Sequence, residues 1–389
     1  MEAFVYDPSQ ADFQERAFEI YRCLRDEHPV YQHPTIGWFA ISRYEDVYAA
    51  ANDREHLSSE GTQGAMGNYP QMQATDPPYH DQLRSLVSAA FTPRRVAAME
   101  PRIREITNGL LDRAAPSGQF DLHHDFACYV PNAVISDLIG VPPERRDEFL
   151  HEAAAIVEHE SQDPEATHAE ALLAVVGRIC IEFEKLLEER RSKRCDDLMS
   201  ALLDVEMEGR RLTTEEIIGF CMLLITAGTD TVMNLVTSGA VRLAQHPDQR
   251  RQLVEDPSRI PLAIEEMLRF DSPAQLLWRK AACDFELHGV PIPKGSDVHL
   301  LWGSANHDER IFEDPERFDI TRQSKHRHLA FGIGRHYCLG ASLARLEAQV
   351  MFEALLRRMP EYELECEPKW LISLWARSYG NVPVRFEHA

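Results

Sequence analysis

A single cysteine near the C-terminus stands in a sequence suited to holding a metal. Cys338 lies within Phe-Gly-Ile-Gly-Arg-His-Tyr-Cys-Leu-Gly, residues 331–340, directly ahead of a strongly helical segment, 341–359. The two glycines before it permit backbone conformations closed to other residues and let the chain lie flat against a large planar group. The following helix predicts free N–H groups and a positive dipole end beside the sulfur, which favour a thiolate. The alternative is an ordinary buried cysteine that packs as a small hydrophobe.

A second group of reactive side chains lies inside a long predicted helix, 214–244. Its sequence at residues 227–231 is Ala-Gly-Thr-Asp-Thr. A glycine in a helix interior costs about 1 kcal/mol relative to alanine, so Gly228 predicts a local opening with room for a small ligand and water. The Thr231 hydroxyl can bond the carbonyl of residue 227, four positions earlier. Asp230 beside this alcohol suits a proton relay, although an N-cap with a surface acid is the alternative.

Charged and histidine side chains recur at spacings that share a helix face. Glu266 and Arg269 are three residues apart in a predicted helix, 260–270, and His80 and Arg84 are four apart where another begins. Most such ion pairs lie on the surface and contribute little to stability. Each of these residues therefore has an ordinary surface role as its alternative interpretation.

The cysteine segment resembles the haem-ligand loop of the cytochrome P-450 family, Phe-Gly-x-Gly-x-His-x-Cys-x-Gly, at every fixed position. The resemblance implies that Cys338 is the axial thiolate of haem b, iron protoporphyrin IX, a ligation that favours O–O bond cleavage. It extends from about Tyr6 to Phe386, with the motifs in the family's order. It implies a single P-450 domain over residues 1–389, mainly α with small β-sheets. The haem is expected between the long central helix and the helix that follows the cysteine.

The same resemblance implies roles for the other motifs. Residues 227–231 are similar to the oxygen-activation motif, so that Thr231 would donate a hydrogen bond to bound dioxygen and Asp230 would help deliver protons. The implied buried ionic triad behind the cysteine loop is Glu266, Arg269 and Arg317. The implied clamps on the two haem propionates are His80, Arg84, Arg279 and His336, since arginine binds carboxylates in bidentate geometry. The other implied haem contacts are Ala227, Phe331, Gly332, Cys338 and Gly340.

The resemblance also implies a substrate pocket built from four separate segments. Its implied lining residues are Met66, Tyr69, Met72, Leu223, Leu224, Ala227, Gln275, Leu276, Leu277 and Trp375. These side chains are mostly apolar, which fits a largely apolar small organic substrate. Leu276 and Trp278 stand where many relatives carry small residues, so the pocket is expected to be narrower or reshaped here.

Composition and charge restrict the class of protein. The chain has 389 residues, of which 44% are hydrophobic, and no stretch approaches the roughly 20 apolar residues needed to span a bilayer. Residues 1–10 lack the pattern of a signal peptide, so we expect a cytoplasmic protein. The net charge of −22 argues against nucleic acid and anionic membranes as partners. The eight cysteines include no CxxC pair, so neither a zinc site nor a disulfide framework is indicated.

One segment around the cysteine runs against the acidic trend. Residues 321–345 contain no aspartate or glutamate and carry three histidines. The cations in this segment are Arg322, Lys325, Arg327, Arg335 and Arg345. They predict a docking patch for an acidic ferredoxin or a flavodoxin-like protein, because opposite fields speed encounter. With its reductase, this partner would bring electrons from NAD(P)H; the alternative is a chance basic face.

Three functions fit these features. The favoured one is a monooxygenase that uses dioxygen, two electrons and protons to hydroxylate or epoxidise an organic substrate. A peroxide-driven peroxygenase is the second, but such members typically lose the acid–alcohol pair that Asp230 and Thr231 form here. A non-catalytic haem-thiolate sensor or ligand carrier is the third, and it would need neither a proton relay nor a docking patch.

Overall fold

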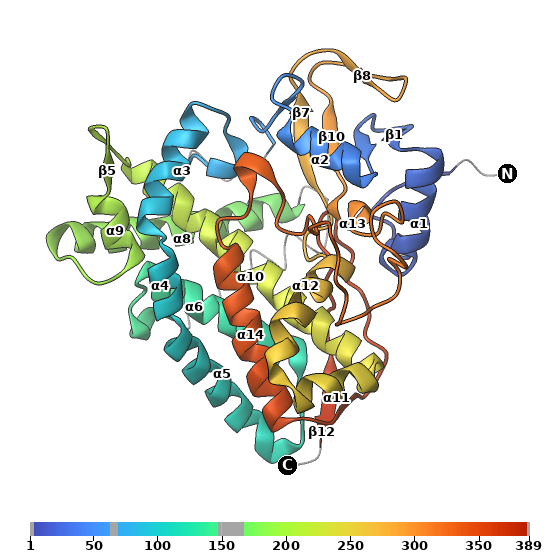
Figure 1. Ribbon diagram of the computed structural model, residues 1–389. Helices are drawn as coiled ribbons and strands as arrows, with labels where there is room; N and C mark the ends of the chain where they lie inside the picture. The colour runs from blue at the N-terminus through green and yellow to red at the C-terminus, as the bar shows by residue number, and fades with distance from the viewer. Residues whose placement is uncertain (1–3, 63–68, 147–148, 150–166, 387–389) are drawn as a thin grey trace.

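The computed structural model describes residues 4–62, 69–146, 149 and 167–386. Helices make up most of it, and the larger sheet gathers at one end (Figure 1). The α-helices are α1 (Phe13–Glu27), α2 (Tyr44–Asn52), α3 (Tyr79–Ala90), α4 (Pro93–Ala98), α5 (Glu100–Ala114), α6 (Tyr129–Ile139), α8 (Thr167–Ser192), α9 (Leu198–Asp204), α10 (Thr214–Gln245), α11 (Pro247–Glu255), α12 (Ile260–Phe270), α13 (Trp302–Ala305) and α14 (Ala341–Arg358).

Twelve short strands form four small sheets within the described part of the chain. The strands are β1 (Val30–Gln32), β2 (Phe39–Ile41), β3 (Leu57–Ser58), β4 (Gln119–Asp121), β5 (Glu206–Met207), β6 (Arg210–Arg211), β7 (Leu277–Ala281), β8 (Phe285–Leu287), β9 (Val290–Ile292), β10 (Asp297–Leu300), β11 (Tyr362–Leu364) and β12 (Pro383–Phe386). The largest sheet has the order β1-β2-β10-β7-β3, and a second has the order β11-β12-β4. The prediction of a mainly helical chain with small sheets is confirmed.

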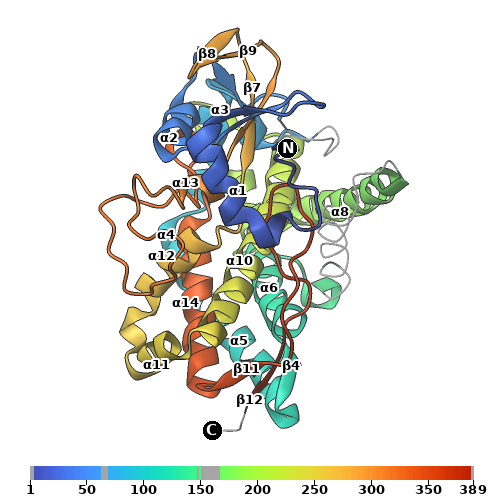
Figure 2. The ribbon, with the colours of Figure 1, turned by 90° about the vertical axis from the view of Figure 1, so that its right-hand side faces the viewer.

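Helix α10 runs through the middle of the molecule between α14 and α6 (Figures 1 and 2). The sequence Thr-Thr-Glu-Glu at residues 213–216 predicts an N-cap, and α10 begins there with a capping box. The Thr213 hydroxyl accepts from the Glu216 amide at 3.2 Å, and the Glu216 carboxylate accepts from the Thr213 amide at 2.9 Å. By length and composition α10 could cross a membrane, but 72% of its most apolar window is buried inside the protein. Its hydropathy is therefore that of a core helix.

The local opening predicted at Gly228 is wrong, because α10 continues unbroken through this residue. A Cβ atom on Gly228 would lie 3.1 Å from the Ile135 side chain of α6. The glycine thus serves the close packing of two helices. A similar contact joins α10 to α14, where a Cβ on Gly239 would lie 2.8 Å from the Phe352 ring. These contacts fix the helix that follows Cys338 against α10.

The sequence pattern predicts helices over residues 95–115, 144–160 and 195–208, and their boundaries move in the structure. The helix predicted over residues 95–115 is two helices, α4 and α5, and Pro101 lies in the first turn of the second. The helix predicted over 195–208 is shortened to α9, and Gly209 turns the chain into β6 at a φ of +77°. Most of the helix predicted over 144–160 lies outside the described residues.

Candidate active site

The cysteine loop has the backbone that its glycines require. Gly332 and Gly334 adopt φ angles of +63° and +68°, in the left-handed region that favours glycine. The Cys338 amide donates to the Phe331 carbonyl at 2.9 Å and closes the loop. A Cβ atom on Gly334 would lie 2.4 Å from the Asn52 amide oxygen, so α2 also presses against the loop. The loop therefore holds the cysteine on a backbone fixed from two sides.

The Cys338 thiol opens into the interior of the protein. Its side chain is exposed to a water-sized probe, yet burial among surrounding atoms raises the pKa of the thiol. Both observations hold if the sulfur faces an internal cavity. Bonds from the Gly340 and Ala341 amides favour the thiolate, as predicted for this helix start, but burial outweighs them. A metal's positive charge would supply the remaining stabilisation of the thiolate.

Helix α10 carries the predicted oxygen-activation motif. Ala227 is exposed although most of the helix around it is buried. Thr231 lies one turn further along, and its hydroxyl donates to the Ala227 carbonyl at 2.8 Å, as predicted. Since a carbonyl only accepts, this bond uses the hydroxyl hydrogen and leaves the Thr231 oxygen as an acceptor. The implied donation to dioxygen would require the hydroxyl to rotate away from Ala227.

Two arginines and two histidines converge beside the cysteine loop. The rings of His80 and His336 are 4.3 Å apart. Arg84 donates to the Tyr337 carbonyl at 2.8 Å, and Arg279 is 8% exposed. Burial lowers the pKa of both arginines, and burial with the nearby Arg279 lowers the pKa of His336 to about 3. The cluster thus brings together all four residues predicted to clamp the haem propionates.

This cluster has the properties of a site for a doubly negative group. Within the described ranges, neither Arg84 nor Arg279 has a carboxylate within ion-pair distance. The Nε2 atom of His80 is buried without a hydrogen-bond partner. Unpaired buried cations are costly, so an anionic ligand would relieve them. The residues present therefore fit the two carboxylates of a haem, and Cys338 would be the residue that holds its metal.

Comparison with known proteins identifies the family. The model of the cytochrome P450 family matches residues 14–370. The chain belongs to the cytochrome P450 family. It is 38% identical to putative cytochrome P450 123 of Mycobacterium tuberculosis over 98% of this chain and 96% of that one. It superposes on cytochrome P450 CYP109Q5 from Chondromyces apiculatus with a TM-score of 0.91 and 35% identity, covering 99% of this chain and 98% of the other.

A third similar structure is P450BioI, solved with a fatty-acyl carrier protein, at a TM-score of 0.90 and 33% identity over 98% of this chain and 100% of that one. The predicted family and fold are confirmed. The protein is accordingly a haem-thiolate monooxygenase with haem b as cofactor, and its electrons come from NAD(P)H through partner proteins.

The ionic triad of this P450 has a different third member from the one predicted. Glu266 binds Arg269 through two bonds of 2.7 and 2.9 Å, and both side chains are 2% exposed. Arg322 completes the group at 3.1 Å from Glu266. Arg317 was predicted in this place, but its side chain is 71% exposed and its nearest acid is Asp319 at 3.9 Å. The assignment of Arg317 to the buried triad is therefore wrong.

The turn between α13 and the cysteine loop explains the exchange. Asp314 adopts a φ of +44°, and the Arg317 amide donates back to the Asp314 carbonyl. This turn directs the Arg317 side chain to solvent. The backbone carbonyl of Arg317 accepts a hydrogen bond from the Arg322 side chain at 2.8 Å. Arg322 also donates to the Glu313 and Asp314 carbonyls. Arg322 thus links this turn to Glu266. It is not an exposed cation of the predicted docking patch.

Two further cations of the predicted patch are occupied inside the P450. Arg345 binds Glu265 at 2.6 and 2.9 Å, and its guanidinium lies 4.4 Å from the centre of the Phe331 ring. Burial alone would raise the pKa of Glu265, but bonds from Arg345 and His328 lower it to about 2. Arg335 is paired with Asp81 of α3. These contacts join α14 to α12 and the cysteine loop to α3, so Arg345 and Arg335 are paired inside the protein instead of facing a partner.

The two remaining cations of the patch, Lys325 and Arg327, are exposed. Arg327 touches the Tyr337 ring, with 4.5 Å between its guanidinium carbon and the ring centre, and donates to the Tyr337 hydroxyl. The predicted basic patch is thereby reduced from five cations to two.

The loop predicted to cover the substrate is held against α10 and α8. A Cβ atom on Gly219 would lie 2.2 Å from the Pro70 carbonyl oxygen, so only glycine permits this approach. The Tyr69 hydroxyl donates to Glu184 of α8 at 3.0 Å. Met72 and Leu223 are buried in the same core cluster, with Leu224 packed against it. Met66 lies outside the described residues.

The predictions for Gln275 and Leu276 are wrong. The Gln275 amide donates to the Ser272 carbonyl at 2.6 Å and accepts from the Tyr21 hydroxyl at 2.8 Å, so both of its ends are engaged in the protein. Leu276 is 2% exposed and packs with Tyr6 and Tyr21 in a separate cluster. Strand β7 begins at the next residue, and successive side chains of a strand point to opposite faces. Leu277 accordingly points away from this cluster and is 41% exposed.

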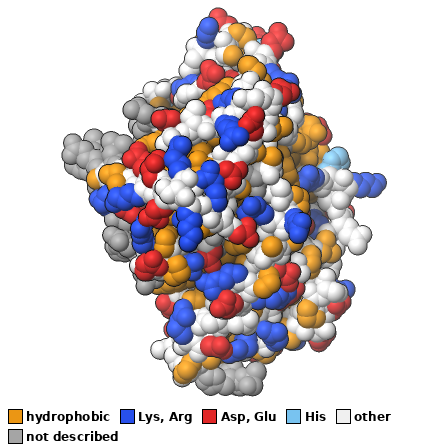
Figure 3. Space-filling view, turned by 90° about the vertical axis from the view of Figure 1, so that its left-hand side faces the viewer, with side chains coloured by type: hydrophobic (Ala, Val, Ile, Leu, Met, Phe, Trp, Pro, Cys, Tyr) orange, Lys and Arg blue, Asp and Glu red, His pale blue; other side chains and the backbone are white. Residues whose placement is uncertain are grey.

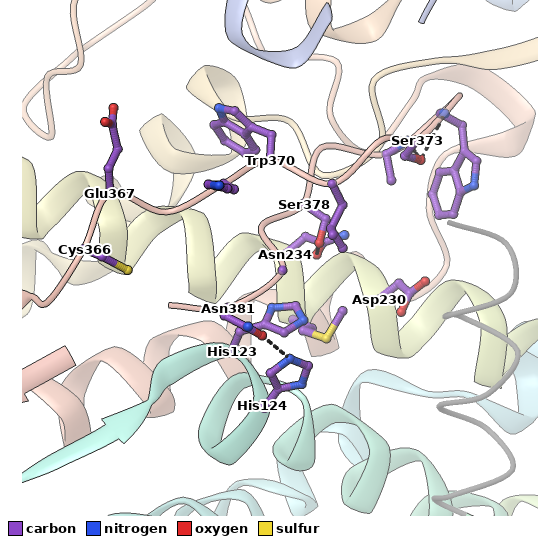
Figure 4. A pocket seen from close by; sticks show the side chains of 16 residues that line it. His123, His124, Asp230, Asn234, Cys366, Glu367, Trp370, Ser373, Ser378 and Asn381 are labelled. Atoms are coloured by element: carbon purple, nitrogen blue, oxygen red, sulfur yellow. Dashed lines mark hydrogen bonds between the residues drawn. The ribbon is translucent and has the colours of Figure 1, made fainter. Parts of the chain in front are cut away.

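Asp230 and Trp375 both line a pocket beside α10 (Figure 4). Asp230 is 7% exposed. Trp375 was predicted to line the substrate pocket. The pocket that it lines in the structure contains no residue of the cysteine loop in its wall. Asp230 lines this pocket, while its neighbour Thr231 bonds the Ala227 carbonyl one turn earlier on the same helix.

Sequence reasoning missed several residues that hold the site together. The Ser59 hydroxyl lies 3.0 Å from the His336 ring and orients it. Glu265 anchors Arg345 and His328. The available signal in the sequence was a pair of adjacent glutamates in α12: Glu266 binds Arg269, and Glu265 binds Arg345 and His328.

Proposed function

We propose that this P450 inserts one oxygen atom of dioxygen into a largely apolar small organic molecule, by hydroxylation or epoxidation, with electrons from an acidic protein partner. The observation that supports the proposal is an accessible Cys338 thiol in a chain that also carries the acid–alcohol pair, Asp230 and Thr231, on α10. A ligand carrier would need the sulfur but not the acid–alcohol pair.

The side chains divide the work as follows. When bound, the haem supplies the redox chemistry that activates dioxygen. Cys338 would bind the metal through its sulfur, and the thiolate would donate electron density to it. Arg84, Arg279 and the paired rings of His80 and His336 would hold the two propionates. Thr231 presents a hydrogen-bond acceptor over the reaction site, and Asp230 holds the proton that the reaction consumes.

We expect Thr231→Ala to uncouple electron consumption from product formation. The variant loses the hydroxyl that positions water and protons beside the substrate, so reductant is spent on hydrogen peroxide instead of product. Product and peroxide formed per NAD(P)H measure the effect. Thr226→Ala is the control, because the Thr226 hydroxyl also donates to a carbonyl of α10, that of Met222, at 3.2 Å. Thr226 lies outside the acid–alcohol pair. Unchanged product per electron in Thr231→Ala would refute this role.

A peroxide-driven peroxygenase remains the second candidate function. Retention of Asp230 and Thr231 argues for the dioxygen-driven reaction, since hydrogen peroxide already carries the protons and electrons that such a pair would manage. Turnover with a surrogate ferredoxin and its reductase, compared with turnover on added peroxide, separates the two. Product with peroxide alone would favour the peroxygenase.

For the electron donor we infer an acidic ferredoxin or flavodoxin-like protein that docks near the cysteine loop. Lys325 and Arg327 support this inference because they are exposed cations in a segment without acids. By contrast, basic and acidic side chains alternate over the face that carries α3, α4 and α5 (Figure 3). P450BioI was solved with an acyl carrier protein, which is an additional kind of partner for that relative.

Reversing both exposed charges, Lys325→Glu with Arg327→Glu, is expected to slow reduction by the natural donor several-fold at low salt. The difference should shrink as salt screens the interaction. Stopped-flow reduction at two ionic strengths measures it. Lys294→Glu, which reverses one exposed charge on the turn after β9 and so makes half the charge change of the double variant, is the control. Equal rates in the double variant and the control would exclude this docking site.

We further infer one P450 domain over residues 1–389 and a cytoplasmic location, where NAD(P)H and its reductases are available. The family match over residues 14–370 supports the single domain. The substrate is best sought by adding compounds to the purified protein and following the absorbance change that accompanies displacement of water from the metal. Largely apolar compounds are expected to give the strongest responses.

A further inference from the structure

A pocket of about 470 Å³ lies against α10 on the side that carries Asp230 and Asn234 (Figure 4). This volume falls within the range of small-molecule sites, about 300–1,000 Å³. The wall comes from residues 123–124 before α6, from residues 230–234 of α10, and from the C-terminal segment 366–381. Apart from Trp375, the described wall contains none of the residues predicted to line the substrate pocket.

Asn234 offers this pocket hydrogen-bond donors that are fixed in direction. Its side chain is 2% exposed and lines the pocket. The Ser378 hydroxyl donates to the Asn234 amide oxygen at 2.6 Å, and this is the shorter of its two contacts, the other being 3.3 Å to the Tyr379 carbonyl. In the described part of the chain the amide nitrogen has no hydrogen-bond partner. A buried amide with two unused donors calls for an acceptor from a ligand.

Asp230 offers an acceptor on the same side of the helix. It is four residues before Asn234, so the two side chains are neighbours on α10, and both line the pocket. A carboxylate has about four lone-pair sites and can accept from a ligand in addition to the protein. The pocket therefore presents a donor and an acceptor next to each other.

The rest of the wall favours an uncharged and largely apolar ligand. Met233, Leu371 and Trp375 line it with apolar surface, whereas the charged Glu367 and Lys369 lie exposed. Among the described lining residues Asp230 is the only charged side chain that is buried. An anion would be repelled by Asp230, and a cation would face the donors of Asn234.

A second buried ionic network holds the C-terminal wall in place. The Arg377 guanidinium donates to Asp271 at 2.9 Å and to the Gln14 carbonyl at 2.7 Å. It also lies 3.8 Å from the centre of the Trp370 ring, which stacks on Tyr379 with 3.6 Å between ring centres. These contacts attach the pocket wall to α1 and to the end of α12, so the pocket is formed without a ligand.

We propose that this pocket is a second small-molecule site, which takes an uncharged, largely apolar molecule with a cis-amide, that is a lactam or a primary carboxamide. In such a group the carbonyl oxygen and an N–H lie on the same edge. The oxygen accepts from the Asn234 amide, and the N–H donates to the Asp230 carboxylate. This binding involves no step of the oxygenation, so the site goes beyond the proposed function.

The probes 2-quinolone and coumarin test this site, because they share one shape and the ring N–H of the first is a ring oxygen in the second. Each is titrated by calorimetry into haem-loaded protein saturated with 4-phenylimidazole, which binds the iron and fills the space above it. We expect one 2-quinolone per chain, bound about tenfold or more tightly than coumarin, because the lost hydrogen bond involves a charged acceptor. A crystal structure of the complex is expected to show the 2-quinolone carbonyl bonded to the Asn234 amide nitrogen.

Variants of the pocket supply the second comparison. Asn234→Leu removes the donors, and Ser378→Ala removes only the bond that orients them, so both are expected to weaken 2-quinolone binding several-fold. Asn108→Leu, the same substitution at a half-buried asparagine of α5, is the control and should bind as the wild type. Circular dichroism and haem content check each variant, and Ser378→Ala decides if Asn234→Leu does not fold.

Equal affinity for the two probes, no binding of 2-quinolone, or unchanged binding in the folded pocket variants would overturn the second site. The proposed function fails on a different result, unchanged product per electron in Thr231→Ala, so the two claims are tested separately.

Discussion

Replacing Glu266 by alanine is expected to lower the free energy of unfolding by on the order of 3–5 kcal/mol and to leave the protein nearly free of haem. The substitution strands two guanidinium groups, because Arg269 and Arg322 both lose the carboxylate that neutralises them inside the protein. It also removes the acceptor for the Asp319 amide at 3.0 Å. Denaturant unfolding followed by circular dichroism, together with the ratio of haem to protein absorbance, measures both effects.

The arginine variants distinguish the observed network from the predicted one. Arg322→Ala is expected to destabilise the protein strongly, because Glu266 then keeps only one cationic partner, Arg269, and the turn around Asp314 loses three bonds to its carbonyls. Arg317→Ala is the matched control, and its exposed side chain predicts a change within about 0.5 kcal/mol. A large loss of stability in Arg317→Ala with none in Arg322→Ala would contradict the network described above.

Cys338→Ala is expected to abolish monooxygenation while the helical fold is retained. The variant removes the only side chain of the loop that can give a thiolate to the metal, but the loop keeps its backbone bond from residue 338 to Phe331 and its glycine turns. Product formation, haem content and circular dichroism are the measurements. Cys195→Ser, which changes another exposed free cysteine, is the control and should behave as the wild type.

Wild-type rates of product formation in Cys338→Ala would show that the sulfur has no part in the reaction. Loss of activity in both Cys338→Ala and Cys195→Ser would point instead to a general sensitivity to cysteine replacement.

Features set by a few neighbouring residues could be read from the sequence. The capping box of Thr213 and Glu216, the bond from Thr231 to the Ala227 carbonyl and the pair of Glu266 with Arg269 all span three or four positions of one helix. Each depends on helical geometry alone, so its prediction needed no tertiary structure. The convergence of the propionate clamps came from the family resemblance, not from spacing.

Features set by distant partners could not be read in this way. Arg335 pairs with Asp81, 254 positions away, and Arg345 pairs with Glu265, 80 positions away. The sequence of residues 321–345 shows no acid near these arginines, so they were predicted to be available to a partner protein. Their acidic partners come from distant parts of the chain. The direction of Arg317 likewise depends on the left-handed turn at Asp314, which the local sequence did not reveal.

Two other misjudgements have the same physical origin. Gly228 was interpreted from helix propensity alone, but the neighbouring helix α6 supplies the reason for a glycine there. Helix α2 was not predicted. Its Val47 is buried in a core cluster together with residues of strands β2 and β10, so the helix is stabilised by packing against the sheet. In both cases packing against an element remote in sequence decided the local structure.

The central claim is that the sulfur of Cys338 binds a haem iron. The most direct measurement is the absorption spectrum of the purified, haem-loaded protein after reduction and addition of carbon monoxide. A thiolate opposite the gas predicts the strongly red-shifted main band that marks this ligation, and its absence from Cys338→His prepared in the same way. A main band at the shorter wavelength in well-folded, haem-loaded wild-type protein would contradict the account.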